Sequence, residues 1–243
     1  MDYSFLQCGE GALTVHLGDG IDPAINRRVT ALQGAIGSAG LRGITDLIPA
    51  YADLTVCYDC TVISAKALQR QLRRLLDSLS VAGQDRRRVF QLPVCHGGDY
   101  GPDLDFVCHH SGLSAQEVIE LHSAPDYLIY MLGFLPGFAY LGGLDPRLHT
   151  PRLDSPRTCI PAGSVGIGGA QTGVYPLASP GGWQLLGRTP VSVFDRQRQE
   201  PILYRAGDLV HFVPISPAEY EKIARAVAAG TYTVQVEEVP VCD

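Results

Sequence analysis

The sequence predicts an α+β protein, with a small N-terminal α+β sandwich followed by a closed or nearly closed β-barrel. Two observations support this fold class. Over roughly the first 90 residues, two amphipathic helical patterns alternate with short apolar runs in the order β–α–β–β–α–β. Many short apolar runs separated by turn residues follow, and only two short helical patterns interrupt them. The 243 residues, 46% of them hydrophobic, suffice for both cores.

The N-terminal elements can be assigned in chain order. Residues 3–18 end in ALTVHLG, which is typical of a strand. Asp22-Pro23 then provides a helix cap with proline at the first helical position, and Ser64 provides the cap of a second helix. Strand-like runs are residues 44–50, 53–58 and 89–94. The polar segment 82–88 interrupts the periodicity, which predicts domains at residues 1–88 and 89–243.

The second domain begins with a turn-rich acidic segment and then a short helix. Ser114 and Glu117 form a capping box, and that helix ends near His122. Ser216 and Glu219 repeat the cap for a helix that Gly230 closes. The expected strands are residues 127–132, 191–194, 202–204, 209–214 and 231–236.

Composition excludes several classes of function. A net charge of −6 and the lack of a basic stripe argue against nucleic-acid binding. Lys66 and Lys222 are the only lysines, and no phosphate-binding GxxxxGK[ST] loop occurs. The uncharged run 127–144 contains a proline and four glycines, so we expect no membrane span. The N-terminus shows no signal pattern, and seven irregularly spaced cysteines suggest reduced thiols without a metal site, so we expect a cytoplasmic protein.

The stretch of residues 133–190 is the candidate functional region. It holds eight of the 17 prolines, 12 of the 27 glycines and the only tryptophan, which predicts short strands joined by rigid turns. Arg152 and Arg157 flank one such turn and could clamp a carboxylate or phosphate. Local pairing of these arginines with Asp154 or Asp145 is the alternative.

Other polar residues add possible chemistry to this region. Gln171, Thr172 and Tyr175 could bind an amide-like substrate, or could satisfy the backbone of a turn. His122 is an acid/base candidate or a helix C-terminal histidine. Ser164 lies in AGSVG, which approximates a nucleophile elbow, but the glycine-rich residues after it do not favour a helix. We therefore interpret Ser164 as a substrate-binding or turn residue rather than the nucleophile of a stand-alone amidase.

Five ordered motifs resemble the B-subunit family of bacterial 5-oxoprolinase. They are residues 133–141 (GFLPGFAYL), 150–157 (TPRLDSPR), 160–167 (IPAGSVGI), 171–176 (QTGVYP) and 179–190 (SPGGWQLLGRTP), and residues 101–104 (GPDL) with His122 also fit. This family includes KipI-type kinase inhibitors and proteins described as allophanate hydrolase subunit 1. The resemblance covers essentially the whole chain.

The resemblance implies a C-terminal domain that is a cyclophilin-like β-barrel. It also implies ATP-dependent opening of the 5-oxoproline lactam to glutamate, by a complex with the C and A subunits. ATP, possibly with Mg²⁺, would be bound by the complex and not tightly by this chain, which would be inactive alone. Two alternatives remain open: inhibition of a histidine kinase, and a role in an allophanate or urea-amide hydrolase. We expect His122, Arg152 and Arg157 as catalytic residues, with Ser164, Gln171, Thr172 and Tyr175 binding the substrate.

Overall fold

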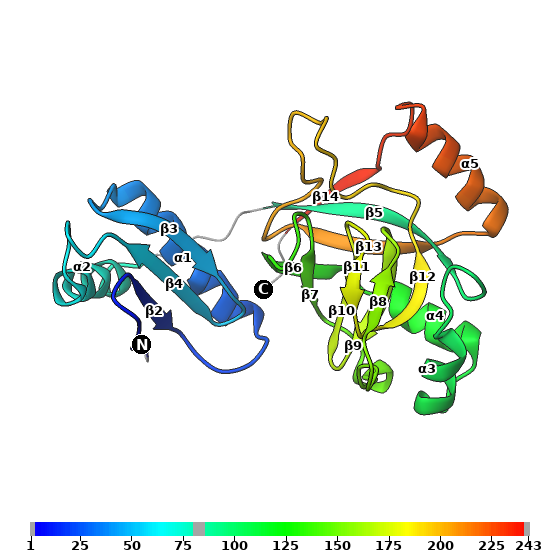
Figure 1. Ribbon diagram of the computed structural model, residues 1–243, viewed down its shortest axis with the longest axis horizontal. Coiled ribbons are helices and arrows are strands. Elements are labelled where there is room, and N and C mark those ends of the chain that lie inside the picture. The colour runs from blue at the N-terminus through cyan, green and yellow to red at the C-terminus, as the bar shows by residue number, and fades with distance from the viewer. Residues whose placement is uncertain (1–2, 80–85, 241–243) are drawn as a thin grey trace. The chain divides into compact units, whose positions relative to one another are not determined.

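The protein folds into two compact units, residues 1–84 and 85–243 (Figure 1). A computed structural model describes residues 3–79 and 86–240. The division falls four residues earlier than the sequence suggests. Arg86–Arg88 belong to the second unit because they begin strand β5 (Arg86–His96) and pair with β14 (Val236–Pro240).

The N-terminal unit is a four-stranded antiparallel sheet covered by two helices. The strands β1 (Ser4–Cys8), β2 (Ala12–His16), β3 (Ile44–Pro49) and β4 (Asp53–Tyr58) run in the order β1-β2-β4-β3. Helices α1 (Pro23–Ala39) and α2 (Ala65–Asp77) contribute one side of the core, including Leu32 and Leu72. The expected single strand over residues 3–18 is a hairpin, because a turn at residues 9–11 separates β1 from β2.

Both helices begin where the sequence predicts. The Asp22 carboxylate accepts hydrogen bonds from the Ala24 and Ile25 amides, and the Ser64 hydroxyl accepts one from the Ala67 amide. Gly40, with φ of 56°, ends α1 in the left-handed conformation that glycine tolerates. These caps satisfy backbone groups that the helix ends would otherwise leave unpaired.

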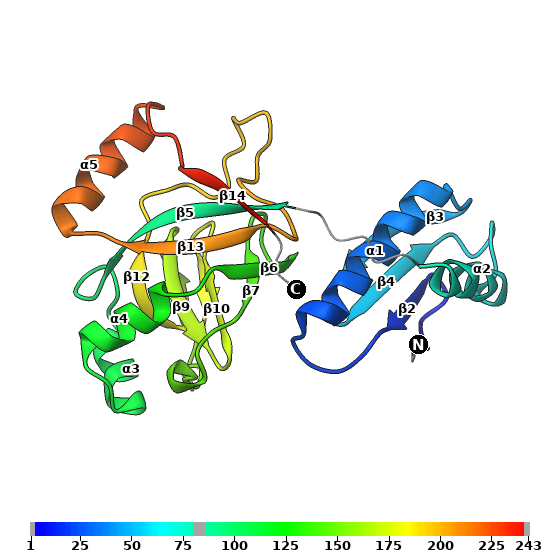
Figure 2. The ribbon, with the colours of Figure 1, turned by 180° about the vertical axis from the view of Figure 1, so that it is seen from behind.

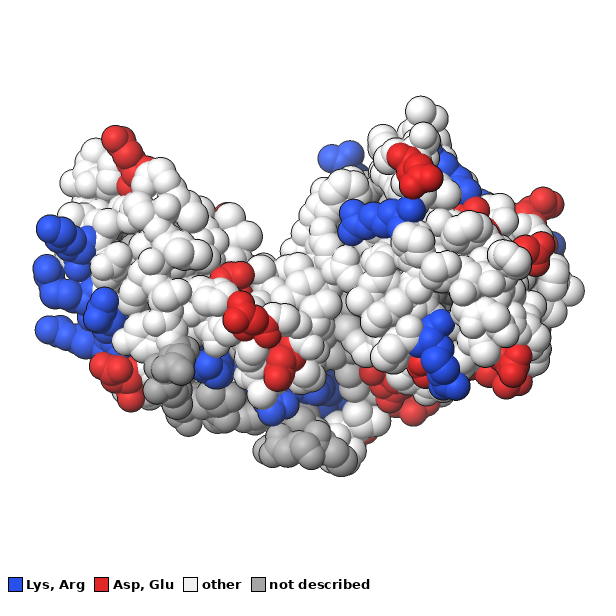
Figure 3. All heavy atoms as spheres, turned by 90° about the horizontal axis from the view of Figure 1, so that it is seen from below, with Lys and Arg blue, Asp and Glu red and all other residues white. Residues whose placement is uncertain are grey.

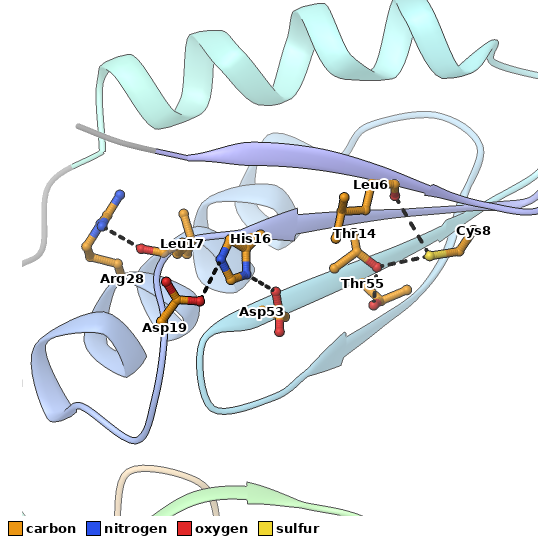
Figure 4. Close-up of polar contacts among 9 residues, drawn as sticks. All are labelled: Leu6, Cys8, Thr14, His16, Leu17, Asp19, Arg28, Asp53 and Thr55. Carbon is orange, nitrogen blue, oxygen red and sulfur yellow. Dashed lines mark hydrogen bonds and ion pairs between the residues drawn. The ribbon is translucent and has the colours of Figure 1, made fainter.

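Side-chain contacts join the strands of this unit on their polar side (Figure 4). The Thr14 and Thr55 hydroxyls lie 2.8 Å apart across β2 and β4, and His16 Nδ1 lies 2.8 Å from Asp53 Oδ1 across the same strand pair. Basic side chains gather over α2 (Figure 3), where Lys66, Arg70, Arg73 and Arg74 are exposed. They form a solvated helix face, and the α2 leucines face the core.

The second unit is a closed β-barrel of seven strands, β12-β9-β10-β7-β6-β13-β5, with β12 pairing back onto β5. Its remaining strands are β6 (Tyr127–Leu132), β7 (Ala139–Gly142), β9 (Ser164–Gly168), β10 (Gln171–Val174), β12 (Gln184–Arg188) and β13 (Leu209–Pro214). β14 adds to β5 outside the closed ring, and β8 (Arg157–Ile160) pairs with β11 (Ser179–Gly181) as a separate ribbon. The predicted α+β fold with a barrel is thus confirmed.

Within its described residues, three helices and one 3₁₀ turn complete the unit. Helices α3 (Leu104–Ser111) and α4 (Ala115–Ser123) lie together beside the barrel and contact β12 and β13 respectively (Figure 2). The 3₁₀ turn is η1 (Pro146–Leu148), and α5 (Pro217–Ala228) follows β13. Both predicted capping boxes are present. No helix within the described residues is long and apolar enough to span a bilayer.

Some expected elements differ from the observed ones. α3 was not expected, because the acidic segment before it indicated only turns. The expected strands at 191–194 and 202–204 are reduced to a single bridge between Phe194 and Ile202. The last strand runs over Val236–Pro240 rather than residues 231–236, since only the later residues pair with β5.

Candidate functional site

Strands β9 and β10 divide the predicted site residues into two groups. Val165 and Ile167 belong to the barrel core, and Thr172 pairs with Ile167, so the Thr172 side chain also points inward. Gln171 pairs with Gly168 and lies on the opposite, outer face. Two residues that are adjacent in the chain therefore serve different surfaces of the same barrel wall.

The inner group is His122 with Thr172. His122, at the end of α4, is fully buried, and its ring stacks on Phe212 with centroids 4.9 Å apart. The Thr172 hydroxyl donates to the Gly166 carbonyl at 3.0 Å, so the 2.8 Å contact to His122 requires His122 Nε2–H to be the donor. This hydrogen bond between His122 and Thr172 links α4 to the inner face of β10.

Burial sets the charge state of two neighbouring histidines. Burial lowers the pKa of His122 to about 3, with a smaller effect from His96, and burial lowers the pKa of His96 to about 4. The two rings lie edge to face with centroids 6.1 Å apart. Both side chains are therefore neutral near pH 7. His122 is fully buried and contacts Thr172 and Phe212, which positions α4 on the barrel, and its expected catalytic role stays a prediction.

The outer group surrounds Trp183. The indole lies against Gly168 and Gly173 on the outer face of β9 and β10, where any side chain at Gly168 would overlap it. Phe138 and Tyr175 pack on Trp183 edge to face, with ring centroids 5.6 and 6.0 Å away. The two glycines thus leave a flat surface on the barrel, and the aromatic cluster packs against it.

Arg152 and Gln171 are the polar members of this cluster. The Arg152 guanidinium lies over the Trp183 ring at 5.9 Å from its centroid, and its Nη2 lies 3.5 Å from Gln171 Oε1. Arg152 is exposed, whereas Trp183 and Tyr175 are buried. We call Arg152, Gln171, Tyr175 and Trp183 the Trp183 face. A ligand from solvent would meet Arg152 and Gln171 first.

Arg157 supports this face from its edge. Its Nη1 donates to the Trp183 carbonyl at 3.3 Å, and its Nη2 donates to Asp103 Oδ1 at 2.6 Å. Asp103 is buried, and its other oxygen accepts the Leu185 amide at 2.7 Å. Arg152 and Arg157 therefore lie on one side of the barrel, but Arg157 is committed to Asp103. The expected two-arginine clamp reduces to one available guanidinium.

Ser164 does not match the geometry of a nucleophile. It opens β9, a strand, and its side chain is fully buried. Its hydroxyl has no hydrogen-bond partner within the described residues. A nucleophile elbow exposes its serine at a turn into a helix. Ser164 and Thr172 are both enclosed in the barrel, so their expected contact with a substrate stays a prediction.

Sequence reasoning missed Asp103 and the role of Trp183. The sequence signal for Asp103 was the glycine of the segment 101–104 (GPDL). Gly101 packs so closely on the Leu186 carbonyl that any side chain at this position would overlap it. This approach brings Asp103 onto β12. No group of three His, Cys, Asp or Glu side chains within the described ranges is arranged to hold a metal ion.

Replacing Gly168 with alanine is expected to displace Trp183 and to destabilise the barrel by about 1–3 kcal/mol, the usual cost of overpacking. Tryptophan fluorescence during urea unfolding reports both effects, since Trp183 is the only tryptophan. Gly182→Ala is the matched control, because its added carbon meets only ordinary contacts of 3.6–3.7 Å. An unchanged emission maximum and urea midpoint in Gly168→Ala would show that Trp183 does not pack on Gly168.

Comparisons with known proteins agree with this fold. Residues 3–204 match the family described as carboxyltransferase domain, subdomain C and D. The chain is 42% identical over 228 residues to the B subunit of 5-oxoprolinase from Bacillus subtilis, covering 90% of this chain and 95% of that protein. The chain belongs to the carboxyltransferase-domain family and to the B-subunit family of 5-oxoprolinase. The resemblance that the five motifs indicated is thus confirmed.

Two further proteins extend the comparison. The B subunit of 5-oxoprolinase from Escherichia coli O157:H7 is 45% identical over 207 residues, covering 85% of this chain and 93% of that protein. The crystal structure of Kluyveromyces lactis urea carboxylase superposes with a TM-score of 0.82 at 23% identity, covering 98% of this chain and 24% of that chain. The latter likeness concerns the fold.

Proposed function

We propose that this chain is the B subunit of a heteromeric 5-oxoprolinase that opens the 5-oxoproline lactam to glutamate at the expense of ATP. The observation that carries the proposal is the match to two known B subunits over 95% and 93% of their lengths. This chain would bind the substrate and would need the A and C subunits for turnover.

The Trp183 face suits a small anionic lactam. The substrate carboxylate would pair with Arg152, whose guanidinium is already oriented by the Trp183 ring. The Gln171 amide lies beside it and offers both a donor and an acceptor to the lactam N–H and carbonyl. Backbone turns braced by Arg157 and Asp103 keep this arrangement rigid.

The chemistry of the reaction explains why a second protein chain is needed. A lactam carbonyl is a poor electrophile, and transfer of a phosphoryl group to its oxygen would create a better leaving group. Phosphoryl transfer requires positive charge around the phosphates, usually with Mg²⁺ held by carboxylates. Asp103 is paired with Arg157 at the edge of the face, and elsewhere in this unit hydrogen bonds from Arg147 hold the pKa of Asp145 at about 2. Both carboxylates are already paired with arginines, so they are not available as Mg²⁺ ligands. We therefore assign ATP binding to the complex.

Arg152→Ala is expected to lower kcat/KM for 5-oxoproline about 10- to 100-fold in the reconstituted complex, because hydrogen bonds to a charged group contribute about 1.5–3 kcal/mol. Glutamate formation by all three purified subunits is the measurement. Arg147→Ala is the matched control, since Arg147 pairs with Asp145 in η1. Equal kinetics in both variants would remove Arg152 from the site. Full turnover by this chain alone would contradict the heteromeric assignment.

Substrate choice separates this proposal from a urea-related one. Urea carries no carboxylate, so it would leave Arg152 without an anionic partner. The same reconstituted complex should therefore consume 5-oxoproline and leave urea unchanged, whereas allophanate carries its own carboxylate and is not excluded by charge. Turnover of either of these compounds in preference to 5-oxoproline would favour the amide-hydrolase alternative.

A further inference from the structure

Helix α5 packs against the barrel without fully burying any of its residues. Its N-terminus is well specified, because Ser216 and Glu219 form a complete capping box and Pro217 occupies the first turn. A helix of 12 residues is normally stabilised by packing one apolar face. The apolar side of α5 instead lines an open groove of about 260 Å³ through Tyr220, Ala224, Val227 and Ala228.

The opposite wall of this groove is built from rigid turns of the barrel. It consists of residues 162–163, Pro176 and residues 189–193. The Gly163 amide donates to the Tyr175 carbonyl at 2.7 Å, and the Thr189 amide donates to the Gly163 carbonyl at 2.9 Å. These bonds and the prolines hold the wall in place, so the groove is preformed. We call it the α5 groove.

Two arginines lie at the rim of the α5 groove. The Arg198 guanidinium donates to the carbonyl of Ser192, a lining residue, at 2.9 Å. Arg188 lies close enough to Tyr220 to oppose the rise in the Tyr220 pKa that burial causes. Neither arginine forms an ion pair with a carboxylate of the described residues. The rim therefore offers two guanidinium groups around an apolar floor, with the Glu221 carboxylate also near Tyr220.

The apolar surface continues beyond the groove. Gly137 approaches the Pro176 side chain, which places the turn of residues 133–138 beside the groove wall. Phe134 in that turn is 66% exposed, and it is the one non-glycine residue with positive φ (64°) among those described. Leu177, next to Pro176, is also exposed. A bulky residue kept in a strained and exposed conformation suggests a functional constraint.

We propose that the α5 groove docks a polypeptide segment of another subunit of the enzyme, and this inference rests on the function proposed above. The segment would insert a bulky apolar side chain between α5 and residues 189–193. Carboxylates flanking that side chain would face Arg188 and Arg198. A second copy of this chain is a poorer occupant, because a two-fold contact would bring two arginine-rimmed grooves together.

The test measures binding of the purified A and C subunits, one at a time, to the immobilised full-length chain. Ala224→Trp would fill the groove, and Ala228→Glu would place a carboxylate at its exposed edge. We expect one of the two subunits to bind the wild-type chain, and each variant to weaken that binding at least tenfold. Lys222→Glu, at a position of α5 that does not line the groove, is the control and should bind as the wild type does. Raising NaCl from about 50 to 300 mM should also weaken binding.

The outcomes separate the two proposals. Binding that both groove variants leave unchanged would overturn the α5 groove as a docking site and leave the function standing. Failure of the wild-type chain to bind either subunit would overturn both. Wild-type self-association that Ala224→Trp abolishes, seen by sedimentation, would replace the proposed partner with a second copy. Near-UV circular dichroism checks the fold, and Ala228→Glu remains informative if Ala224→Trp does not fold, because Ala228 is exposed.

Discussion

Asp103→Ala is expected to lower the free energy of unfolding of the barrel unit by about 3 kcal/mol. The substitution removes the acceptor of two bonds, from Arg157 Nη2 at 2.6 Å and from the Leu185 amide at 2.7 Å. The amide would remain buried without a partner, and the guanidinium, about one third exposed, would lose its counter-charge. Urea unfolding followed by Trp183 fluorescence measures the change in this unit alone.

Two companion variants make this prediction sharper. Asp105→Ala, an exposed carboxylate in the same helix, should change stability by less than about 1 kcal/mol. Arg157→Ala should also destabilise the barrel, because the buried Asp103 carboxylate would lose its ion-pair partner. A double-mutant cycle of Asp103 and Arg157 isolates their coupling. A coupling energy near zero would show that the pair contributes nothing to the fold.

Acidification from pH 7 to pH 5 is expected to destabilise the barrel through His122 and His96. Burial lowers the pKa of these histidines to about 3 and about 4 in the folded state, whereas the unfolded chain titrates near its ordinary value of 6.5. Below pH 6.5 the unfolded state therefore binds protons that the folded state excludes. The stability present above pH 6.5 is lost as the pH falls towards 4 and 3, at about 1.4 kcal/mol per pH unit for each histidine, or about 2 kcal/mol each at pH 5.

The measurement is the urea midpoint by Trp183 fluorescence at intervals between pH 7.5 and 5. His122→Gln keeps a donor for the Thr172 hydroxyl and removes one titrating group, so the pH dependence should fall by about half. His149→Gln, at an exposed histidine, should retain the full dependence. An identical pH slope in His122→Gln and the wild type would show that His122 is not buried in its neutral form.

Local signals in the chain were sufficient for most element boundaries. Caps at Asp22, Ser64, Ser114 and Ser216 specify helix starts through side-chain bonds to amides within three residues, so the information is contiguous. α3 was missed because its cap residue Asp103 makes no side-chain bond to its own helix. That carboxylate bonds to Arg157 of β8 and to Leu185 of β12 instead, which no local pattern reveals.

The sequence by itself determined the fold class, the family and the small set of polar residues from which a site could be built. The tertiary structure decided which of them share a surface. Thr172 and Gln171 are neighbours in the chain, but the pleat of β10 sends one to His122 inside the barrel and the other to Arg152 outside it. Likewise, only closure of the barrel brings Asp103 to Arg157, 54 residues away, and leaves Arg152 as the available guanidinium.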